Sequence, residues 1–198
     1  HKHSFLQTFI FTPTDWHLLR KCPCPVLLVK EGHWQRGGNL IAAINCSSDD
    51  KEQKVLNERI TREGIAIAEL LGASLYLVNT YPGTPVNVAI ELPEFDPNAY
   101  NDAIRKHHED LLREHADQFG INHMWTKVAE GLPEEVLPDM ADDLNATLMI
   151  MGCVGRTGLS AALLGNTAEH VVDRLNCDIL ILKPDDYSCP VDDRRHPA

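Results

Sequence analysis

The sequence predicts an α/β protein whose core is a doubly wound, five-stranded parallel sheet. Short continuous apolar runs, typical of strands buried on both faces, alternate with longer stretches of helical periodicity. Five strand-like and four helix-like segments follow one another in this way. Such alternation predicts a parallel sheet with helices on both faces, and right-handed crossovers leave few arrangements. We expect the flavodoxin-like strand order 3-2-1-4-5.

The first elements of this domain are two strands and the helix between them. Residues 39–45 form an apolar strand, and residues 50–71 form a helix that begins after cap-forming serines and aspartates and ends at Gly72. Residues 74–79 form the second strand. The segment 81–98 contains four prolines and several apolar residues, and we expect its apolar side chains to pack on the sheet.

The rest of the domain continues the alternation. Gly120 ends the second helix, and a proline followed by two glutamates begins the third, an arrangement that suits a helix N-terminus. The remaining elements are expected at residues 98–119 (helix), 124–129 (strand), 133–144 (helix), 146–151 (strand), 167–175 (helix) and 178–182 (strand).

Composition restricts the possible partners. The net charge of −11 disfavours a nucleic-acid backbone or an anionic membrane, because both would repel the chain. No apolar run reaches the ~20 residues that span a bilayer, and the start of the chain has no signal-peptide pattern, so we expect a cytoplasmic protein. The six cysteines lack a metal-type double CxxC and predict small buried hydrophobic residues rather than disulfides.

The beginning of the chain repeats its end. Residues 14–30 match residues 167–183 without gaps at a constant offset of 153, and each copy has the pattern of a last helix followed by a last strand. In five of the matched pairs the two residues are identical. The members from the first copy are Thr14, His17, Cys24, Leu27 and Lys30. Chance similarity of two helix–strand patterns is one explanation, and duplication is the other. Duplication divides the chain into a first-domain remnant (1–35), a complete second domain (36–185) and a loose tail (186–198).

A ligand site is expected where the strand order reverses, beyond the carboxyl ends of the first and fourth strands. Glycines there let backbone N–H groups approach an anion, and the N-terminus of the next helix adds donors and a favourable dipole. The same glycines could instead serve only a tight strand-to-helix connection. The expected site residues are Asn45, Ser47, Gly152, Val154, Gly155, Arg156, Gly165, Asn166 and Thr167.

The spacing of these glycines resembles a family motif. Gly152-x2-Gly155-x9-Gly165 is similar to the G-x2-G-x9-G-(S/T) motif of the universal stress protein family, and the resemblance covers residues 38–185. Residues 91–97 and 154–158 resemble the tandem two-domain bacterial members. The resemblance implies that the glycine loop holds the triphosphate of ATP, which makes ATP the cofactor to test.

Two positions depart from the family motif. Asn166 follows the last glycine where the family has Ser or Thr, and Asn45 stands where ATP-binding members have Asp at the end of the first strand. Asparagine keeps a carbonyl acceptor, adds donors and loses the negative charge, so it no longer helps to hold a cation. Nucleotide binding through a metal is therefore weakened at this site.

The resemblance implies a stress-response regulator that binds a small molecule and is not an enzyme. Three alternatives stay open: a slow ATPase or phosphotransferase, a binder of an apolar, lipid-like ligand covered by the segment 81–98, and an interaction scaffold without nucleotide. The resemblance also implies that last strands pair between domains or between chains, as in a homodimer. Residues 25–30 should then pair antiparallel with residues 178–183.

Three histidines lie on the helix expected at residues 98–119. His108 and His115 are seven residues apart and therefore share one face, with His107 beside them. No cysteine or third histidine is placed on the face shared by His108 and His115 to complete a metal site. We interpret these residues as part of a solvated helix face.

Overall fold

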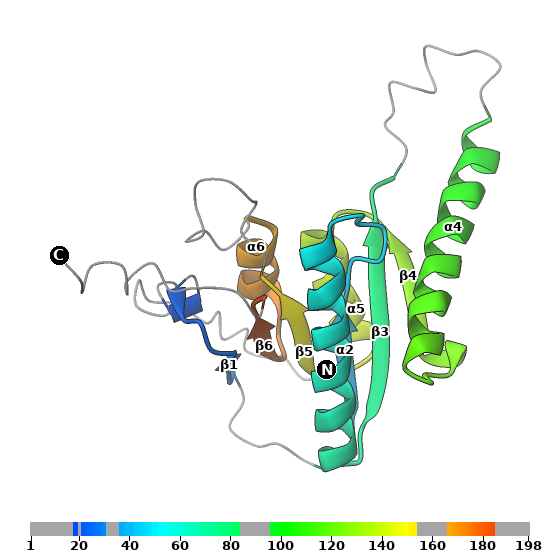
Figure 1. Cartoon of the computed structure of the whole chain (residues 1–198). Coiled ribbons are helices and arrows are strands. Elements are labelled where there is room, and N and C mark those ends of the chain that lie inside the picture. Colours follow the sequence, from blue (N-terminus) through cyan, green and yellow to red (C-terminus); the bar gives the residue numbers. More distant parts are fainter. Residues whose placement is uncertain (1–17, 20, 31–35, 84–95, 154–165, 185–198) are drawn as a thin grey trace, which may run out of the picture.

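The computed structural model describes residues 18–19, 21–30, 36–83, 96–153 and 166–184, which form one sheet with helices on both faces (Figure 1). The strands are β1 (Val26–Leu28), β2 (Asn39–Ala43), β3 (Ser74–Tyr81), β4 (Thr126–Glu130), β5 (Ala146–Gly152) and β6 (Asp178–Leu182). The helices are α2 (Lys51–Leu71), α4 (Pro97–Gln118), the 3₁₀ turn η1 (His123–Trp125), α5 (Pro133–Asp143) and α6 (Asn166–Arg174).

The sheet has six strands in the order β1-β6-β5-β2-β3-β4. Strands β2 to β6 pair in parallel, and β1 pairs antiparallel with β6. The five parallel strands therefore have the predicted order 3-2-1-4-5, and the predicted α/β class is confirmed. The tail expected at residues 186–198 lies outside the described residues, as does most of the segment 81–98.

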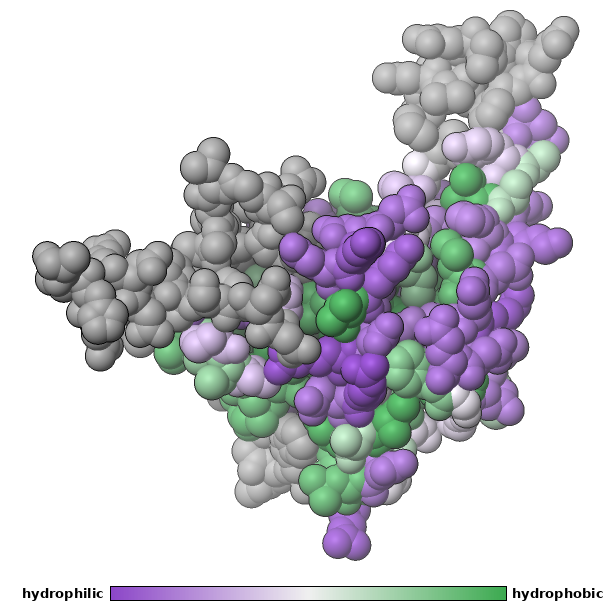
Figure 2. Space-filling model, in the orientation of Figure 1, coloured by the Kyte–Doolittle hydropathy of each residue, from purple (hydrophilic) through white to green (hydrophobic). Residues whose placement is uncertain are grey.

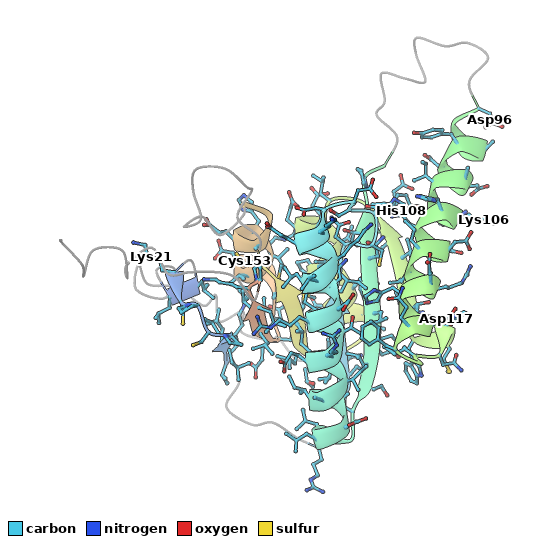
Figure 3. The ribbon with its side chains drawn as sticks, viewed as in Figure 1. Lys21, Asp96, Lys106, His108, Asp117 and Cys153 are labelled. Atoms are coloured by element: carbon cyan, nitrogen blue, oxygen red, sulfur yellow. The ribbon has the colours of Figure 1, made fainter. Side chains whose placement is uncertain are left out.

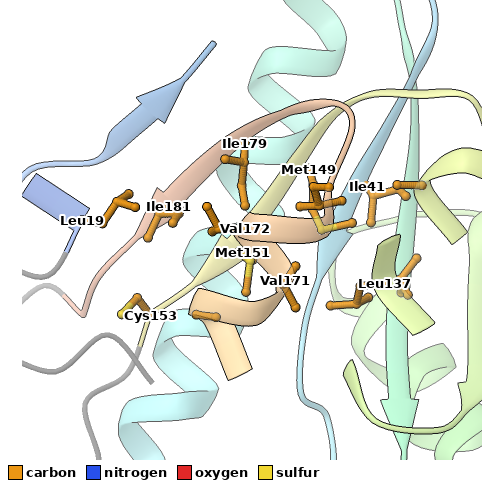
Figure 4. Close-up of a cluster of buried hydrophobic side chains, with 14 residues drawn as sticks. Leu19, Ile41, Leu137, Met149, Met151, Cys153, Val171, Val172, Ile179 and Ile181 are labelled. Carbon is orange, nitrogen blue, oxygen red and sulfur yellow. The ribbon is translucent and has the colours of Figure 1, made fainter. Parts of the chain in front are cut away.

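The core consists of two apolar clusters, one on each face of the sheet, because successive strand side chains point to opposite faces. Leu40 and Ala42 of β2 join the cluster under α2 and α4, whereas Ile41 joins the cluster under α5 and α6. The cluster under α5 and α6 contains Leu19 and residues of β5, β6 and α6 (Figure 4). Hydrophilic side chains cover much of the outer surface of α2 and α4 (Figure 2).

Several strand boundaries differ from the prediction by one or two residues, and two of the differences have a clear local reason. The strand expected at residues 124–129 begins at Thr126, because Asn122 caps the turn η1 by accepting a hydrogen bond from the Met124 N–H (2.9 Å). Strand β2 ends at Ala43 instead of residue 45. Ile44 still donates to the sheet, to the Val78 carbonyl (2.9 Å), but the next two backbone N–H groups bond to side chains.

Strand β1 lies against β6 in a reciprocal contact. The register pairs Leu27 with Leu180 at its centre, and the two flanking pairs place residues 26 and 28 opposite residues 181 and 179. The repeat offset of 153 also relates Leu27 to Leu180. The predicted antiparallel pairing of residues 25–30 with residues 178–183 is confirmed over these three pairs.

Two lysines complete the reciprocal contact. Lys30 Nζ donates to the Val172 carbonyl (3.0 Å) and to the Leu175 carbonyl, at the end of α6. Lys183 Nζ donates to the Cys22 carbonyl (2.7 Å), and this lysine is only 2% exposed. The same offset relates Lys30 to Lys183 and Cys22 to Leu175. Each lysine therefore satisfies a carbonyl of the opposite copy, in the manner of a cation at a helix C-terminus.

Replacing Lys183 tests how strongly this contact holds the first segment. Lys183→Met keeps the length of the side chain and removes the donor to Cys22, so we expect the free energy of unfolding in urea to fall by ~1–3 kcal/mol. Amide exchange of β1 should accelerate with it. Lys127→Met, at an exposed position of β4, is the matched control. Equal effects of the two variants would contradict a structural role of the Lys183 ammonium group.

Candidate functional site

The candidate site lies where β2 and β5 end side by side. These strands are parallel neighbours, with Ala43 opposite Met151 near their carboxyl ends. After β2 the chain enters α2 on one face of the sheet, and after β5 it leads to α6 on the other face. This divergence is the topological switch point at which open α/β sheets bind ligands.

A buried asparagine of α2 holds Asn45, in the loop that follows β2. Asn57 Oδ1 accepts from the Asn45 N–H (3.1 Å), and Asn57 Nδ2 donates to the Asn45 carbonyl (2.7 Å). Gln53 Nε2 also donates to Asn57 Oδ1 (2.8 Å). Asn57 is 3% exposed, so this side chain continues the pairing that the sheet no longer provides.

A buried asparagine of β3 holds Cys46, the residue after Asn45 in the same loop. Asn79 Oδ1 accepts from the Cys46 N–H (3.2 Å), and Asn79 Nδ2 lies 2.9 Å from His108 Nδ1. The His108 ring stacks on Tyr81, with ring centroids 4.9 Å apart. His108 lies on the side of α4 that faces β3 (Figure 3). A continuous buried contact therefore runs from α4 through β3 to the exit of β2.

The side chains that the loop presents to solvent are polar. Asn45 and Ser47 are exposed, and Ser47 Oγ donates to Asn45 Oδ1 (3.0 Å). This bond uses one of the two lone pairs of Oδ1, and the Nδ2 group of Asn45 carries two donors for a ligand. At position 45 the loop therefore offers hydrogen-bond donors to a ligand rather than a negative charge to a cation.

Gly152, at the end of β5, has a packing reason to be glycine. A Cβ atom there would lie 2.5 Å from Leu56 Cδ2 and 2.9 Å from Leu56 Cγ of α2. Such distances are too short for carbon atoms, so a side chain at position 152 would force the buried Leu56 side chain or α2 itself to shift. Packing of β5 against α2 is therefore a reason for glycine at position 152 that does not depend on a ligand.

The other predicted site residues are only partly placed. Val154, Gly155, Arg156 and Gly165 lie outside the described residues. Asn166 and Thr167 are the first two residues of α6, and their side chains also lie outside the description. Since α6 returns antiparallel to β5, its N-terminus lies at the same edge of the sheet as the exit of β2.

The interpretation of the α4 histidines as a solvated face is wrong for two of them. His108 is 7% exposed, and His115 Nε2 lies 2.8 Å from the Thr61 hydroxyl of α2. The Thr61 hydroxyl in turn donates to the Asn57 carbonyl (2.9 Å). Residues seven apart share a helix face, as expected, but here that face packs inward because it finds polar partners.

Burial changes the chemistry of two groups at the site. It lowers the pKa of His108, and the neighbouring His107 lowers it further. Burial also raises the pKa of the Cys46 thiol to about 12, so this cysteine stays protonated near neutral pH and is a poor nucleophile. Among the described cysteines, Cys153 is buried as predicted, whereas Cys24 is exposed and contradicts that prediction.

Two kinds of feature are absent from the described part of the chain. No group of three or more His, Cys, Asp or Glu residues there is arranged to hold a metal ion. None of its helices is long and apolar enough to cross a membrane.

Comparison with known proteins finds both sequence and structural relatives. Universal stress protein E of Escherichia coli K12 is 52% identical over 193 residues, which cover 97% of this chain and 61% of that protein. A solved structure of a functionally unknown Pseudomonas aeruginosa protein has a TM-score of 0.75 and 33% identity, covering 94% of this chain and 62% of that one. The chain thus spans about three fifths of the length of these relatives.

A single-unit relative shows the same fold. The universal stress protein UspA of Lactobacillus plantarum aligns over 76% of this chain and 99% of its own, with a TM-score of 0.56 and 18% identity. In addition, the model of the universal stress protein family matches residues 53–183, which include most of α2 and the strands β3 to β6. The match to the family model and the identity to universal stress protein E agree, and the chain belongs to the universal stress protein family.

Proposed function

We propose that this chain is a stress-response binding module whose small-molecule site lies at the carboxyl ends of β2 and β5. The observation that carries the proposal is the fixed exit of β2. Two consecutive residues there, Asn45 and Cys46, have backbone groups held by buried asparagines. A loop held in this way presents its exposed polar side chains in one geometry, which lowers the entropic cost of binding.

A nucleotide-like anion is the ligand class that suits this edge best. Asn45 offers donors through Nδ2, and α6 directs its N-terminal backbone donors to the same edge. The glycine spacing of the sequence resembles the phosphate-holding motif of the family. In the proposal, Ser47, Val154, Gly155, Arg156, Gly165, Asn166 and Thr167 supply the remaining contacts to the phosphates and sugar.

Binding without catalysis is part of the proposal. Hydrolysis of a nucleotide requires a metal ion and a group that positions water. At the family's carboxylate position this chain has Asn45, whose amide donates instead of binding a cation. We therefore propose a regulator that responds to its bound ligand, in preference to a slow ATPase.

We also propose a duplicated organisation, with residues 1–35 as the end of a first universal stress domain, 36–185 as a complete second domain and 186–198 as a tail. The reciprocal contacts of Lys30 and Lys183 support it, because equivalent groups exchange contacts in this way when two copies of one unit meet about a twofold axis. The same pairing of last strands between two chains would give a homodimer.

The direct test is the identity of the retained ligand. The full chain would be purified gently and denatured, and the released small molecules would be measured by mass spectrometry. We expect ATP, ADP or a related nucleotide at roughly one per chain, because a preformed site releases a well-matched ligand slowly. A lipid-like species would overturn the nucleotide proposal in favour of an apolar ligand, and an empty protein that also binds no added ATP would favour a scaffold.

Restoring the family's carboxylate should change how the site responds to magnesium. In Asn45→Asp, without divalent cations, we expect ATP affinity to fall roughly three- to tenfold, because the carboxylate repels phosphate. With Mg²⁺ the affinity should recover or exceed that of the original chain, since a carboxylate helps to hold the metal. Calorimetric titration with and without Mg²⁺ measures both effects.

The control for this experiment adds the same charge at the opposite side of the sheet, where the strands begin. Asn122 caps the turn η1 through its side-chain oxygen, and an aspartate can accept the same bond. Asn122→Asp should leave ATP affinity unchanged with or without Mg²⁺. If Asn45→Asp behaves like Asn122→Asp, then position 45 does not contact the nucleotide.

Replacing Gly152 separates packing from ligand contact. We expect Gly152→Ala to lower the free energy of unfolding by ~1–3 kcal/mol, because the added Cβ overlaps Leu56. In a Leu56→Ala background, which makes room for the methyl group, the same substitution should cost less. Urea unfolding of the four proteins completes this double-mutant cycle. A Gly152→Ala variant of unchanged stability that loses its ligand would contradict the packing explanation.

A further inference from the structure

Helix α4 reaches the exit of β2 through two separate hydrogen-bonded routes. His108 contacts Asn79, which binds the Cys46 N–H. His115 contacts Thr61, whose hydroxyl donates to the backbone carbonyl of Asn57. The two histidines lie on one face of α4, yet they meet partners of opposite kind.

The hydrogen-bond pattern fixes the proton positions on both rings. Asn79 Oδ1 accepts from the Cys46 N–H, so its Nδ2 group faces His108 as a donor. His108 Nδ1 must then be an unprotonated acceptor, and the neutral ring carries its proton on Nε2. In the other route, the Thr61 hydroxyl gives its proton to Asn57, so His115 Nε2 acts as the donor.

We propose that His108 is a positioning residue that makes the geometry of the Asn45–Cys46 loop, and through it ligand binding, depend on pH. Neutral His108 orients the Asn79 amide so that its oxygen holds the Cys46 N–H. A proton on Nδ1 would place two donors face to face. If the Asn79 amide turns over to accept from the ring, its NH₂ group then faces the Cys46 N–H. Either arrangement releases one of the two contacts, so protonation loosens the loop.

The surroundings of His108 favour the neutral ring without forbidding the proton. Burial lowers its pKa first, and His107 on the same helix lowers it further. From β3 the Tyr81 ring stacks on it. Burial raises the pKa of Tyr81, as do the nearby carboxylates of Glu130, Glu109 and Asp102, whereas Arg105 lowers it. The Cys46 thiol of the loop stays neutral because burial raises its pKa to about 12. The group that titrates at this contact is therefore the imidazole of His108.

His115 behaves differently, although burial lowers its pKa as well. Its contact uses a donor, which the protonated ring retains. Protonation of His115 therefore leaves the route through Thr61 intact. The loop should respond to pH on the Cys46 side and keep its attachment on the Asn45 side.

The Cys46 amide reports on the proposed switch without any ligand. In ¹⁵N-labelled full-length protein, titrated from about pH 8 to about pH 5, we expect the Cys46 amide resonance to shift with the same midpoint as the His108 ring. Because folding lowers this pKa below its ordinary value of 6.5, the unfolded chain binds the proton more readily. Stability supplied by the contact is therefore complete above pH 6.5 and declines as the pH falls towards the folded-state pKa.

Two variants separate the proton from the ring. His108→Asn keeps a side-chain oxygen near the position of Nδ1 and does not titrate, so the Cys46 amide should stay bonded and lose its pH dependence. His108→Phe keeps the ring against Tyr81 and removes the acceptor, so the Cys46 amide should resemble the low-pH state at every pH. His123→Asn removes an exposed histidine paired with Asp117 and should leave the Cys46 titration unchanged.

The outcomes separate this inference from the proposed function on which its ligand effect rests. A Cys46 amide that ignores the His108 titration, or that shifts equally in His108→Asn, would overturn the switch whether or not a nucleotide binds. If ATP binds, its affinity should fall more steeply with decreasing pH in the original chain than in His108→Asn. We expect a difference of up to tenfold for each unit by which ATP binding lowers the pKa of His108. Failure of ATP to bind, with an intact amide titration, would reject only the ligand.

Discussion

Buried backbone N–H and C=O groups at the ends of strands and helices must find other hydrogen-bond partners. This constraint shapes two places in the structure. At the exit of β2, the side-chain amides of Asn57 and Asn79 take over from the neighbouring strands. At the junction of β1 and β6, Lys30 and Lys183 take carbonyls at helix ends. Each solution fixes a position in space: the first holds a loop at the switch point, and the second holds β1 on the sheet.

The fold could be predicted because its signals are local and repeated. The apolar run at residues 39–45 and the glycine at position 72 each identify an element or its end, and five strands in alternation with helices leave few topologies. The pairing of β1 with β6 was also predictable, because the repeat at an offset of 153 marks the two strands as equivalent. Strand ends were less predictable, since β2 stops where side chains, and not turn residues, take its N–H groups.

The position of the candidate site could be predicted from the sequence, but the residues that hold its loop in place could not. The switch point follows from topology, so Asn45 and Ser47 were identified as candidates. Asn57 and Asn79 were missed, although both are buried. Asn79 follows the apolar residues Leu77 and Val78 in its strand, which is a signal for a buried, satisfied amide, whereas Asn57 lies in the mostly polar first half of its helix and gives no such signal. The histidines of α4 were misinterpreted because periodicity shows that His108 and His115 share a face but not whether that face is covered.

The arrangement at α4 also explains why two similar residues on one face should differ in consequence. A buried imidazole that accepts a hydrogen bond is incompatible with its own protonation, whereas one that donates is not. His108 is the acceptor and His115 the donor, because their partners on β3 and α2 have opposite requirements. Because Asn79 donates to His108 and Thr61 accepts from His115, protonation disrupts the first contact and leaves the second intact. That difference requires the Asn79 oxygen to be committed to the Cys46 N–H, so the loop at the switch point and the protonation of α4 are parts of one hydrogen-bonded unit.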